Sequence, residues 1–358
     1  ATTIAAAAAL SIAAGTRVLI DDRVSLTVLG TLRASGSPAD PIVISRAGEA
    51  PWGGLRLLAG ASAELDDTWF LAGGGDASLA FGHSSSQPVI HAEGATLAMT
   101  GGGVLDSPGK AFGGAGAELE LEGILVSRCD TGGQIEASRT TIGTSYFLEI
   151  PDADGVIDDD DNDGLYVSGV LVTDGVEQPS VIRDSVFAVG EDDAIDHHDA
   201  LLRVERVWIQ GFAHEGVAAS VGRTVTVVDS VISDCDQGVE AGYGSPTVVV
   251  EHTLISGCEH GLRYGDGYDW EVAGSLTATG TVAAGNPRNV WNWVNVLGGP
   301  VEGAITIQCS MVDDPAWDGQ DGNLAGTPTW DGDGCLAAGS PGAAAACDGD
   351  DVGPRCPP

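Results

Sequence analysis

The chain has 358 residues, with 52 acidic side chains against 15 basic ones, and its formal net charge is −37. So strong a negative charge repels nucleic acids and anionic membrane surfaces, and we expect neither as a partner. No stretch reaches the roughly 18 apolar residues that a membrane span requires. The longest, at 5–14, is rich in alanine and lacks a basic flank, so it is neither a span nor an intact signal peptide.

The first segment with a specific signal is an acidic insertion at 151–164. Its run DADGVIDDDDNDG places seven aspartates between positions 152 and 163. Asp159, Asp161 and Asp163 have the alternate spacing with which a calcium loop begins, although the twelfth position is Val170 instead of glutamate. Carboxylates this crowded repel one another unless a cation neutralises them. We therefore predict calcium as a cofactor here, and an acidic loop without metal is the alternative.

Four consecutive repeats follow the insertion. They read DSVFAVGEDDAIDHH from 184, RVWIQGFAHEGVAAS from 206, DSVISDCDQGVEAGY from 229 and HTLISGCEHGLRYGD from 252, so their starts are 22, 23 and 23 residues apart. Each contains only short β-prone runs separated by Gly, Asp or Ser, with no helical periodicity. A unit this small cannot bury a core by itself, whereas stacked coils bury a continuous one.

Aligned repeats give apolar columns that become ladders inside a cylinder. One column is Phe187, Ile209, Ile232 and Ile255, a second is Ile195, Val217, Val239 and Leu262, and glycines at 216, 238 and 261 precede the second. Trp208 shares a column with aliphatic residues, which predicts a core position for it. Propellers, leucine-rich repeats and hexapeptide helices need periods or signatures that are absent. The prediction is an all-β fold, a single right-handed parallel β-helix of roughly a dozen coils.

One β-helix domain is expected over 1–298, with coils recognisable from about Thr16. Residues 299–358 are expected to form a closing coil and a disulfide-tied cap. Seven cysteines occur without any CxxC pair, which disfavours structural zinc. Cys309 and Cys335 bracket one C-terminal loop, and Cys347 and Cys356 bracket another. Disulfides there would fit an oxidising compartment.

Two further cysteines, Cys235 and Cys258, occupy identical positions in adjacent repeats. They are either small core thiols or an in-register disulfide.

Five of the seven histidines lie between 197 and 260, within the best-matched repeats. If Ile195 points inward, strand alternation turns Asp196 and His198 outward. The residues equivalent to Asp196 in later coils are Ala218, Glu240 and Arg263. This alignment predicts a shallow acidic groove with the arginine at one end.

A second polar column lies beside this groove, and aromatic residues nearby offer the flat surfaces on which sugars stack. The column comprises Asp193, Glu215, Gln237 and His260, and the aromatic residues are Tyr243, Tyr264, Tyr268 and Trp270.

Such a group of side chains suits proton abstraction beside a sugar carboxylate, as in polysaccharide lyases and uronate epimerases. That reaction needs a cation to neutralise the carboxylate, a base and an acid. Arg263 or calcium would supply the first, His198 the second, and Tyr243 or Tyr264 the third. A glycosidase pair of Asp196 and Glu240, about 10 Å apart by strand stacking, is the catalytic alternative. For each residue alone, a solvated surface role is the simpler interpretation.

Three resemblances support this interpretation. The stretch DHHD at 196–199 resembles the DPHD motif of alginate epimerases, with histidine in place of proline at 197 and Asp193 where that family has tyrosine. The N-terminal stretch LSIAAGTRVLIDDRVSLTVLGTLRASGSPADPIVISRAGEAPWGGLRLL resembles the opening coils of bacterial surface β-helix proteins. The stretch 150–291, with HEGVA, QGVEAGYGSP and NVWNW, resembles the pectate-lyase-like β-helix region that accompanies spore-coat-H-type kinase-like domains.

These resemblances imply a secreted or cell-surface bacterial protein. Neither a glycine-rich phosphate loop nor an HRD-type loop occurs, so kinase activity is not implied. Two functional classes remain open. The first is a carbohydrate-active protein that engages a polysaccharide or cell-surface glycan. The second is a non-catalytic adhesin, stalk or coat module, for which self-association is expected.

Overall fold

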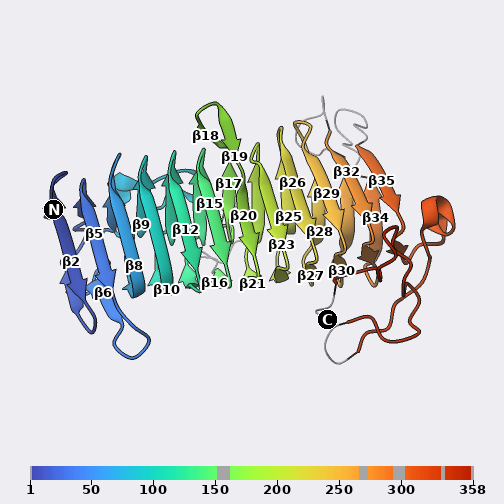
Figure 1. The fold of residues 1–358 in the computed structure, drawn as a ribbon, viewed down its shortest axis with the longest axis horizontal. Coiled ribbons are helices and arrows are strands. Elements are labelled where there is room, and N and C mark those ends of the chain that lie inside the picture. Colours follow the sequence, from blue (N-terminus) through green and yellow to red (C-terminus); the bar gives the residue numbers. More distant parts are fainter. Residues whose placement is uncertain (1, 151–161, 266–272, 293–302, 332–334, 356–358) are drawn as a thin grey trace. The chain divides into compact units, whose positions relative to one another are not determined.

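Short parallel β-strands, each followed by a turn, account for nearly all of the regular structure (Figure 1). The computed structural model describes residues 2–150, 162–265, 273–292, 303–331 and 335–355. Two compact units divide the chain, Ala1–Asp192 and Asp193–Pro358. In each unit the strands pair in parallel with strands one coil later, which is the arrangement of a right-handed parallel β-helix. The predicted fold class is confirmed.

In unit 1, one face of the coils is a sheet of seven strands. In order they are β1 (Thr2–Ile4), β4 (Leu26–Val28), β7 (Leu55–Leu57), β9 (Ile90–Glu93), β11 (Phe112–Ala115), β14 (Gly133–Glu136) and β17 (Tyr166–Ser168). The other faces comprise β2 (Ala9–Ala13), β3 (Arg17–Ile20), β5 (Thr31–Ser35), β6 (Ile42–Arg46), β8 (Ser62–Leu71), β10 (Thr96–Ser107), β12 (Glu118–Glu122), β13 (Leu125–Cys129), β15 (Arg139–Gly143), β16 (Tyr146–Ile150), β20 (Ser180–Arg183) and β21 (Val186–Gly190). An antiparallel hairpin, β18 (Leu171–Thr173) with β19 (Val176–Gln178), and the short helices η1 (Ala77–Leu79) and η2 (His83–Ser85) lie outside the ladders.

In unit 2, the equivalent sheet has five strands, β22 (Ile195–His198), β25 (Glu215–Ser220), β28 (Gln237–Ala241), β31 (His260–Tyr264) and β34 (Arg288–Asn292). The other faces comprise β23 (Leu202–Glu205), β24 (Trp208–Phe212), β26 (Thr224–Val228), β27 (Val231–Ser233), β29 (Thr247–Glu251), β30 (Leu254–Ser256), β32 (Ser275–Thr279), β33 (Val282–Ala283), β35 (Ala304–Gln308) and β36 (Met311–Val312). Helices η3 (Pro315–Trp317) and η4 (Gln320–Gly322) follow.

The apolar ladders of the repeats form the core of unit 2. Ile209, Ile232 and Ile255 are partners in register on successive strands, and all three side chains are fully buried. The glycine column reflects close backbone stacking, because a Cβ on Gly238 would lie 2.6 Å from the carbonyl oxygen of Gly261. The ladders predicted from the repeat spacing are therefore confirmed.

Two expectations about the coils are wrong. Trp208 is in register with Val231, as predicted, but its side chain is 47% exposed instead of buried in the core. Its neighbour Ile209 points inward, so alternation along the strand turns Trp208 outward. The first coil also begins earlier than Thr16, because β1 starts at Thr2 and pairs with β4.

The C-terminal region closes over the last coils of unit 2. A disulfide joins Cys309 with Cys347, so the pairing expected between neighbouring cysteines is wrong: the bond links the end of β35 to the distal loop. Cys335 is also disulfide-bonded. Val352 of the cap lies in one buried apolar cluster with Val282 and Met311 of the last coils.

The in-register cysteines of the repeats do not form a disulfide. Cys235 and Cys258 are buried thiols whose Sγ atoms donate to backbone carbonyl oxygens of their own coils. Of the two alternatives, these cysteines are therefore small core thiols and not a disulfide.

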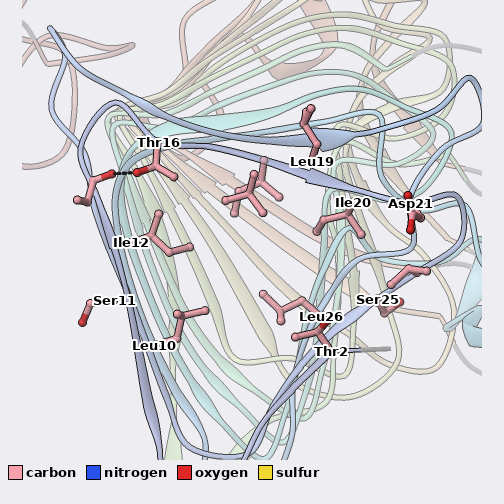
Figure 2. Close-up of a pocket in the computed structure, with 14 residues that line it drawn as sticks. Thr2, Leu10, Ser11, Ile12, Thr16, Leu19, Ile20, Asp21, Ser25 and Leu26 are labelled. Atoms are coloured by element: carbon pink, nitrogen blue, oxygen red, sulfur yellow. Dashed lines mark hydrogen bonds between the residues drawn. The ribbon is translucent and has the colours of Figure 1, made fainter.

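At the N-terminal end of unit 1, the coil interior opens into a cavity of about 450 Å³. Leu10 and Ile12 point into it from one side, as Figure 2 shows, and Leu26 lies on the other. Its charged lining residue is Asp21, and the rest of the lining is apolar or uncharged. This composition makes it an exposed end of the core, without convergent polar groups that would fix a ligand.

Candidate functional site

The polar side chains that the repeats align lie on neighbouring strands of the five-stranded sheet of unit 2. Asp196 on β22 is in register with Ala218 on β25, and Glu240 on β28 with Arg263 on β31. The neighbouring polar column is also in register, and its members on β25, β28 and β31 are Glu215, Gln237 and His260. The predicted alignment of these columns is thus present.

Their environment differs from the expected shallow groove. Glu240 is 7% exposed and Arg263 is 4% exposed, so neither side chain lines an open acidic surface. Arg263 Nη1 lies 2.6 Å from Glu240 Oε1, so the two side chains form an ion pair. Burial is tolerated because each charge has an opposite partner. The expectation of a shallow groove over these two residues is therefore wrong.

Glu215 lies at the centre of this buried network and is 1% exposed. Arg263 Nη1 is 3.6 Å from its Oε1 atom, and the Gln237 side-chain amide donates a hydrogen bond to the same oxygen. The Glu215 backbone N–H donates to Asp193 Oδ1 at 2.8 Å. Strand β25 is thereby held between acidic and amide side chains of the flanking coils.

His214 connects this network to solvent. Its Nδ1 atom lies 2.5 Å from Glu215 Oε2 and 3.3 Å from Asp193 Oδ1, while its side chain is 32% exposed. The alignment of the repeats did not predict a functional role for His214. The aligned columns include only residues on strands, and His214 lies just before β25. Its place directly before the polar column was the available signal.

The electrostatics of the network favour a proton on Glu215. Burial is the largest cause that raises the pKa of Glu215 to about 7, and repulsion from Glu240 is the second. Hydrogen bonds with His214 and Asp193 act in the opposite direction and lower it. Burial also raises the pKa of Glu240, although the charge of Arg263 opposes this. A carboxyl with a pKa near neutrality beside a half-exposed imidazole is suited to proton transfer.

Asp196 and His198 point away from the core as predicted, and both are half-buried. His198 Nδ1 lies 3.1 Å from Ser220 Oγ on the next strand, which orients the imidazole. Between them, His197 faces the core with Nε2 2.6 Å from the carbonyl oxygen of Ala200, and burial lowers its pKa. The residue that differs from the epimerase motif is thus a core histidine.

A basic and aromatic group lies at the other end of the polar column. His260 stacks on Trp291 with ring centroids 3.8 Å apart, and its Nε2 lies 2.7 Å from Arg288 Nη1. The Arg288 guanidinium also lies over the Trp291 ring, 5.2 Å from its centroid. Burial lowers the pKa of His260, which favours the neutral ring that accepts from arginine.

Of the four aromatic residues predicted to stack on sugars, two lie within the described residues. Tyr243 and Tyr264 are both half-buried. Tyr243 follows strand β28, and Tyr264 is the last residue of β31. Tyr268 and Trp270 lie outside the described residues, so their role stays a prediction.

The predicted calcium ligands are likewise only partly placed. Asp159 and Asp161 lie outside the described residues. Asp163 is buried, and its backbone carbonyl accepts a hydrogen bond from the Gly132 N–H at 3.0 Å. The adjacent Asn162 amide donates to Glu191 at 3.1 Å. A carboxylate held in a buried polar setting fits the hard oxygen ligands that calcium prefers.

No protein-family model and no curated protein matches the sequence. Among solved structures, a rhamnogalacturonan lyase superposes with a TM-score of 0.43 at 11% identity, over 90% of this chain and 87% of its own. The catalytic domain of a GH87 alpha-1,3-glucanase gives a TM-score of 0.44 at 10% identity. The match covers 83% of this chain and 63% of the glucanase chain, which is less than two thirds of its length. An alginate lyase from Paenibacillus sp. gives 0.34 at 12% identity, over 84% and 97%. The fold assignment rests on the strand register described above.

Proposed function

We propose that this protein binds an acidic polysaccharide over the coils of unit 2 and acts on it by proton transfer, as a lyase or epimerase. The carrying observation is the contact of the half-exposed His214 with Glu215, whose pKa is raised to about 7. His214 presents the reactive nitrogen to substrate, and Glu215 exchanges the proton behind it. Asp193, on the same imidazole edge, orients the ring.

His198 and Asp196 belong to the same proposed site, one strand away from β25. In this proposal His214 takes the proton beside the sugar carboxylate and returns it to the leaving oxygen. His198, in register with Ser220 at the far end of β25, binds a neighbouring sugar unit together with Tyr243 or Tyr264. Arg263 already pairs with Glu240. Asp193 and Asp196, whose carboxylate oxygens lie within 4.8 Å of one another, would hold a calcium ion whose charge would neutralise the substrate carboxylate. The proposal places the protein outside the cell or on its surface, which the Cys309–Cys347 disulfide supports.

The test replaces His214 with glutamine and His198 with alanine, each alone, and measures binding and turnover of alginate and pectate with calcium present. Turnover is followed by the ultraviolet absorbance of unsaturated product and by epimer analysis. We expect His214→Gln to lose at least 100-fold in turnover while keeping its binding, and His198→Ala to bind the polysaccharide more weakly. Glu259→Gln, an exposed carboxylate two coils further along, is the control. Wild-type turnover in both histidine variants would contradict the proposal.

Calcium binding at the acidic insertion has its own test, with Asp163→Asn as the variant. Crowded carboxylates bound to a cation hold the folded loop, so calcium stabilises the folded state in proportion to its occupancy. We expect a chelator to lower the melting temperature of the wild type and calcium to restore it. The variant should respond less. Superimposable wild-type melting curves with calcium and with chelator would contradict a structural calcium site.

A non-catalytic surface module is the second candidate, and the burial of Arg263 and Glu240 favours it. The ion pair between these two neighbouring coils is complete without a substrate. Glycan binding without turnover in the wild type, unaffected by His214→Gln, would select this candidate over the first.

A further inference from the structure

An exposed arginine lies on the same sheet of unit 2 as the proposed site, which assigns it no role. The five strands of this sheet, β22, β25, β28, β31 and β34, carry two arginines, Arg263 and Arg288. Arg263 is buried and paired with Glu240. The side chain of Arg288, at the start of β34, is 53% exposed. Since arginine is always charged, Arg288 is the permanent cation with which these strands can meet an anion from solvent.

The strand register places Arg288 in line with the reactive pair of the proposed site. Glu215 on β25 is in register with Gln237 on β28. Gln237 is in register with His260 on β31, and His260 with Arg288 on β34. The strands follow one another in this order along unit 2 (Figure 1), and three steps between parallel strands amount to roughly 14 Å. A long ligand that crosses the strands from His214, next to Glu215, therefore reaches Arg288.

Contacts with two ring side chains hold the guanidinium of Arg288 in place. Its Nη1 atom donates a hydrogen bond of 2.7 Å to His260 Nε2, and the guanidinium lies 5.2 Å from the centroid of the Trp291 ring. His260 is itself stacked on Trp291, with ring centroids 3.8 Å apart. A guanidinium fixed in this way loses little conformational freedom on binding, and its planar fork matches the two oxygens of a carboxylate.

The acidic neighbour of Arg288 holds it only loosely. Glu259 Oε1 lies 3.8 Å from Arg288 Nη1, and both side chains are about half-exposed. An exposed ion pair of this kind contributes little free energy, so a second carboxylate can replace it. Within the described residues, the polar contacts of the guanidinium are made by Nη1. The N–H groups of Nε and Nη2 can therefore donate to both oxygens of a bound carboxylate.

We propose that Arg288 binds a carboxylate of the polysaccharide about three sugar units away from the sugar that reacts at His214. This inference rests on the proposed function, and it specifies the ligand as a polyuronate long enough to cross the strands from β25 to β34. The count follows because a pyranose ring is about as wide as the spacing of two parallel strands. A chain with a net charge of −37 repels such a polyanion, and an exposed cation along the path of the ligand reduces this repulsion.

The experiment measures how galacturonate and mannuronate oligomers, each as dimer and hexamer, bind to the full chain with calcium present. Calorimetry is done in the His214→Gln background, so that no oligomer is consumed, and KM and kcat are measured with His214 in place. We expect Arg288→Gln to bind the hexamer roughly tenfold more weakly and to raise its KM in parallel. The dimer is too short to reach Arg288, so its binding, like kcat, should stay within about twofold.

Two other substitutions serve as matched comparisons. Arg33→Gln removes an exposed arginine of unit 1 that also pairs with a glutamate, Glu64, at 3.1 Å, and it should leave hexamer binding unchanged. Glu259→Gln removes the carboxylate that competes for Arg288, so it should bind the hexamer at least as tightly as wild type. A hexagalacturonate methyl ester lacks the charged groups, and Arg288→Gln should not weaken its binding.

The outcomes separate this inference from the proposed function. Hexamer binding that falls in Arg288→Gln and persists in Arg33→Gln supports the role of Arg288. Equal hexamer binding by these two variants, or the same loss with the methyl ester, would overturn it and leave the proposed function standing. A folded wild-type protein that binds neither oligomer series would contradict both.

Discussion

At the scale of single residues, Glu215 shows how burial turns an ordinary carboxyl into a neutral acid. Its desolvation outweighs the hydrogen bonds from His214 and Asp193, so its pKa rises to about 7 from 4.5. Between these two pH values the folded protein keeps a proton that the unfolded chain releases. Stability from Glu215 is therefore fully present below about pH 4.5, falls as pH rises, and is lost above about pH 7.

The prediction for this residue compares Glu215→Gln with wild type. The amide cannot ionise, so the variant avoids a cost on the order of 3 kcal/mol that wild type incurs above neutrality. We expect the melting temperature of the variant, relative to wild type, to be higher at pH 8 than at pH 5. Glu259→Gln, which is exposed, should show no such trend. A constant difference across this range in a calorimetric titration would refute the prediction.

At the scale of the strand elements, one turn repeats in every coil of unit 2. A residue with positive φ lies at the same place in successive coils. These residues are Arg206, Asp229, His252, Gly280 and Cys309. A hydroxyl residue follows it in the later coils, and its oxygen accepts a backbone N–H from the preceding coil. The Val207 N–H donates to Ser230 Oγ at 3.1 Å, and the Thr281 N–H donates to Ser310 Oγ at 3.1 Å.

The prediction for this turn concerns Ser230→Ala. The change leaves the buried Val207 N–H without its acceptor, which costs about 1–3 kcal/mol of unfolding free energy. Urea unfolding followed by circular dichroism measures the loss. Ser233→Ala on the same coil is the control, because its half-buried side chain lies on β27 outside this turn, and a change below about 0.5 kcal/mol is expected. Equal effects of the two substitutions would argue against the hydroxyl ladder.

At the scale of the whole molecule, the C-terminal cap is tied to the coils of unit 2 by several kinds of contact. His252 Nε2 lies 3.0 Å from Asp348 Oδ2, and Arg355 pairs with the same carboxylate at 2.8 Å. Burial alone would raise the pKa of Asp348, but hydrogen bonds from the Asp350 backbone and Arg355 lower it to about 2. The cap therefore stays anchored through this carboxylate until the pH falls well below 4.

Within the described residues no helix is long and apolar enough to cross a membrane. Replacing Cys309 and Cys347 with alanine opens a link across 38 residues and should cost roughly 2–4 kcal/mol. Hydrogen exchange should accelerate in residues 336–355 and stay slow in β22 and β25. Unchanged exchange in the cap would show that the apolar and ionic contacts hold it alone.

The sequence by itself determined which residues stack. Among the four aligned repeats, a spacing of 22 or 23 residues sets the partners of the ladders, and strand alternation sets the two faces, so Ile232 and Ile255, or Glu240 and Arg263, were paired in advance. The core position predicted for Trp208 was wrong, because the column alignment was followed there instead of the alternation that turns it outward beside the buried Ile209.

Only the tertiary structure decided how the outward face is used. Arg263 and Glu240 are buried and paired, and His214 contacts Glu215 from outside the strand, because these properties depend on the packing of adjacent coils and turns. The Cys309–Cys347 bond likewise depends on the path by which the cap returns to the coils. Spacing along a chain specifies register, whereas burial and long-range pairing arise from contacts between segments that spacing does not encode.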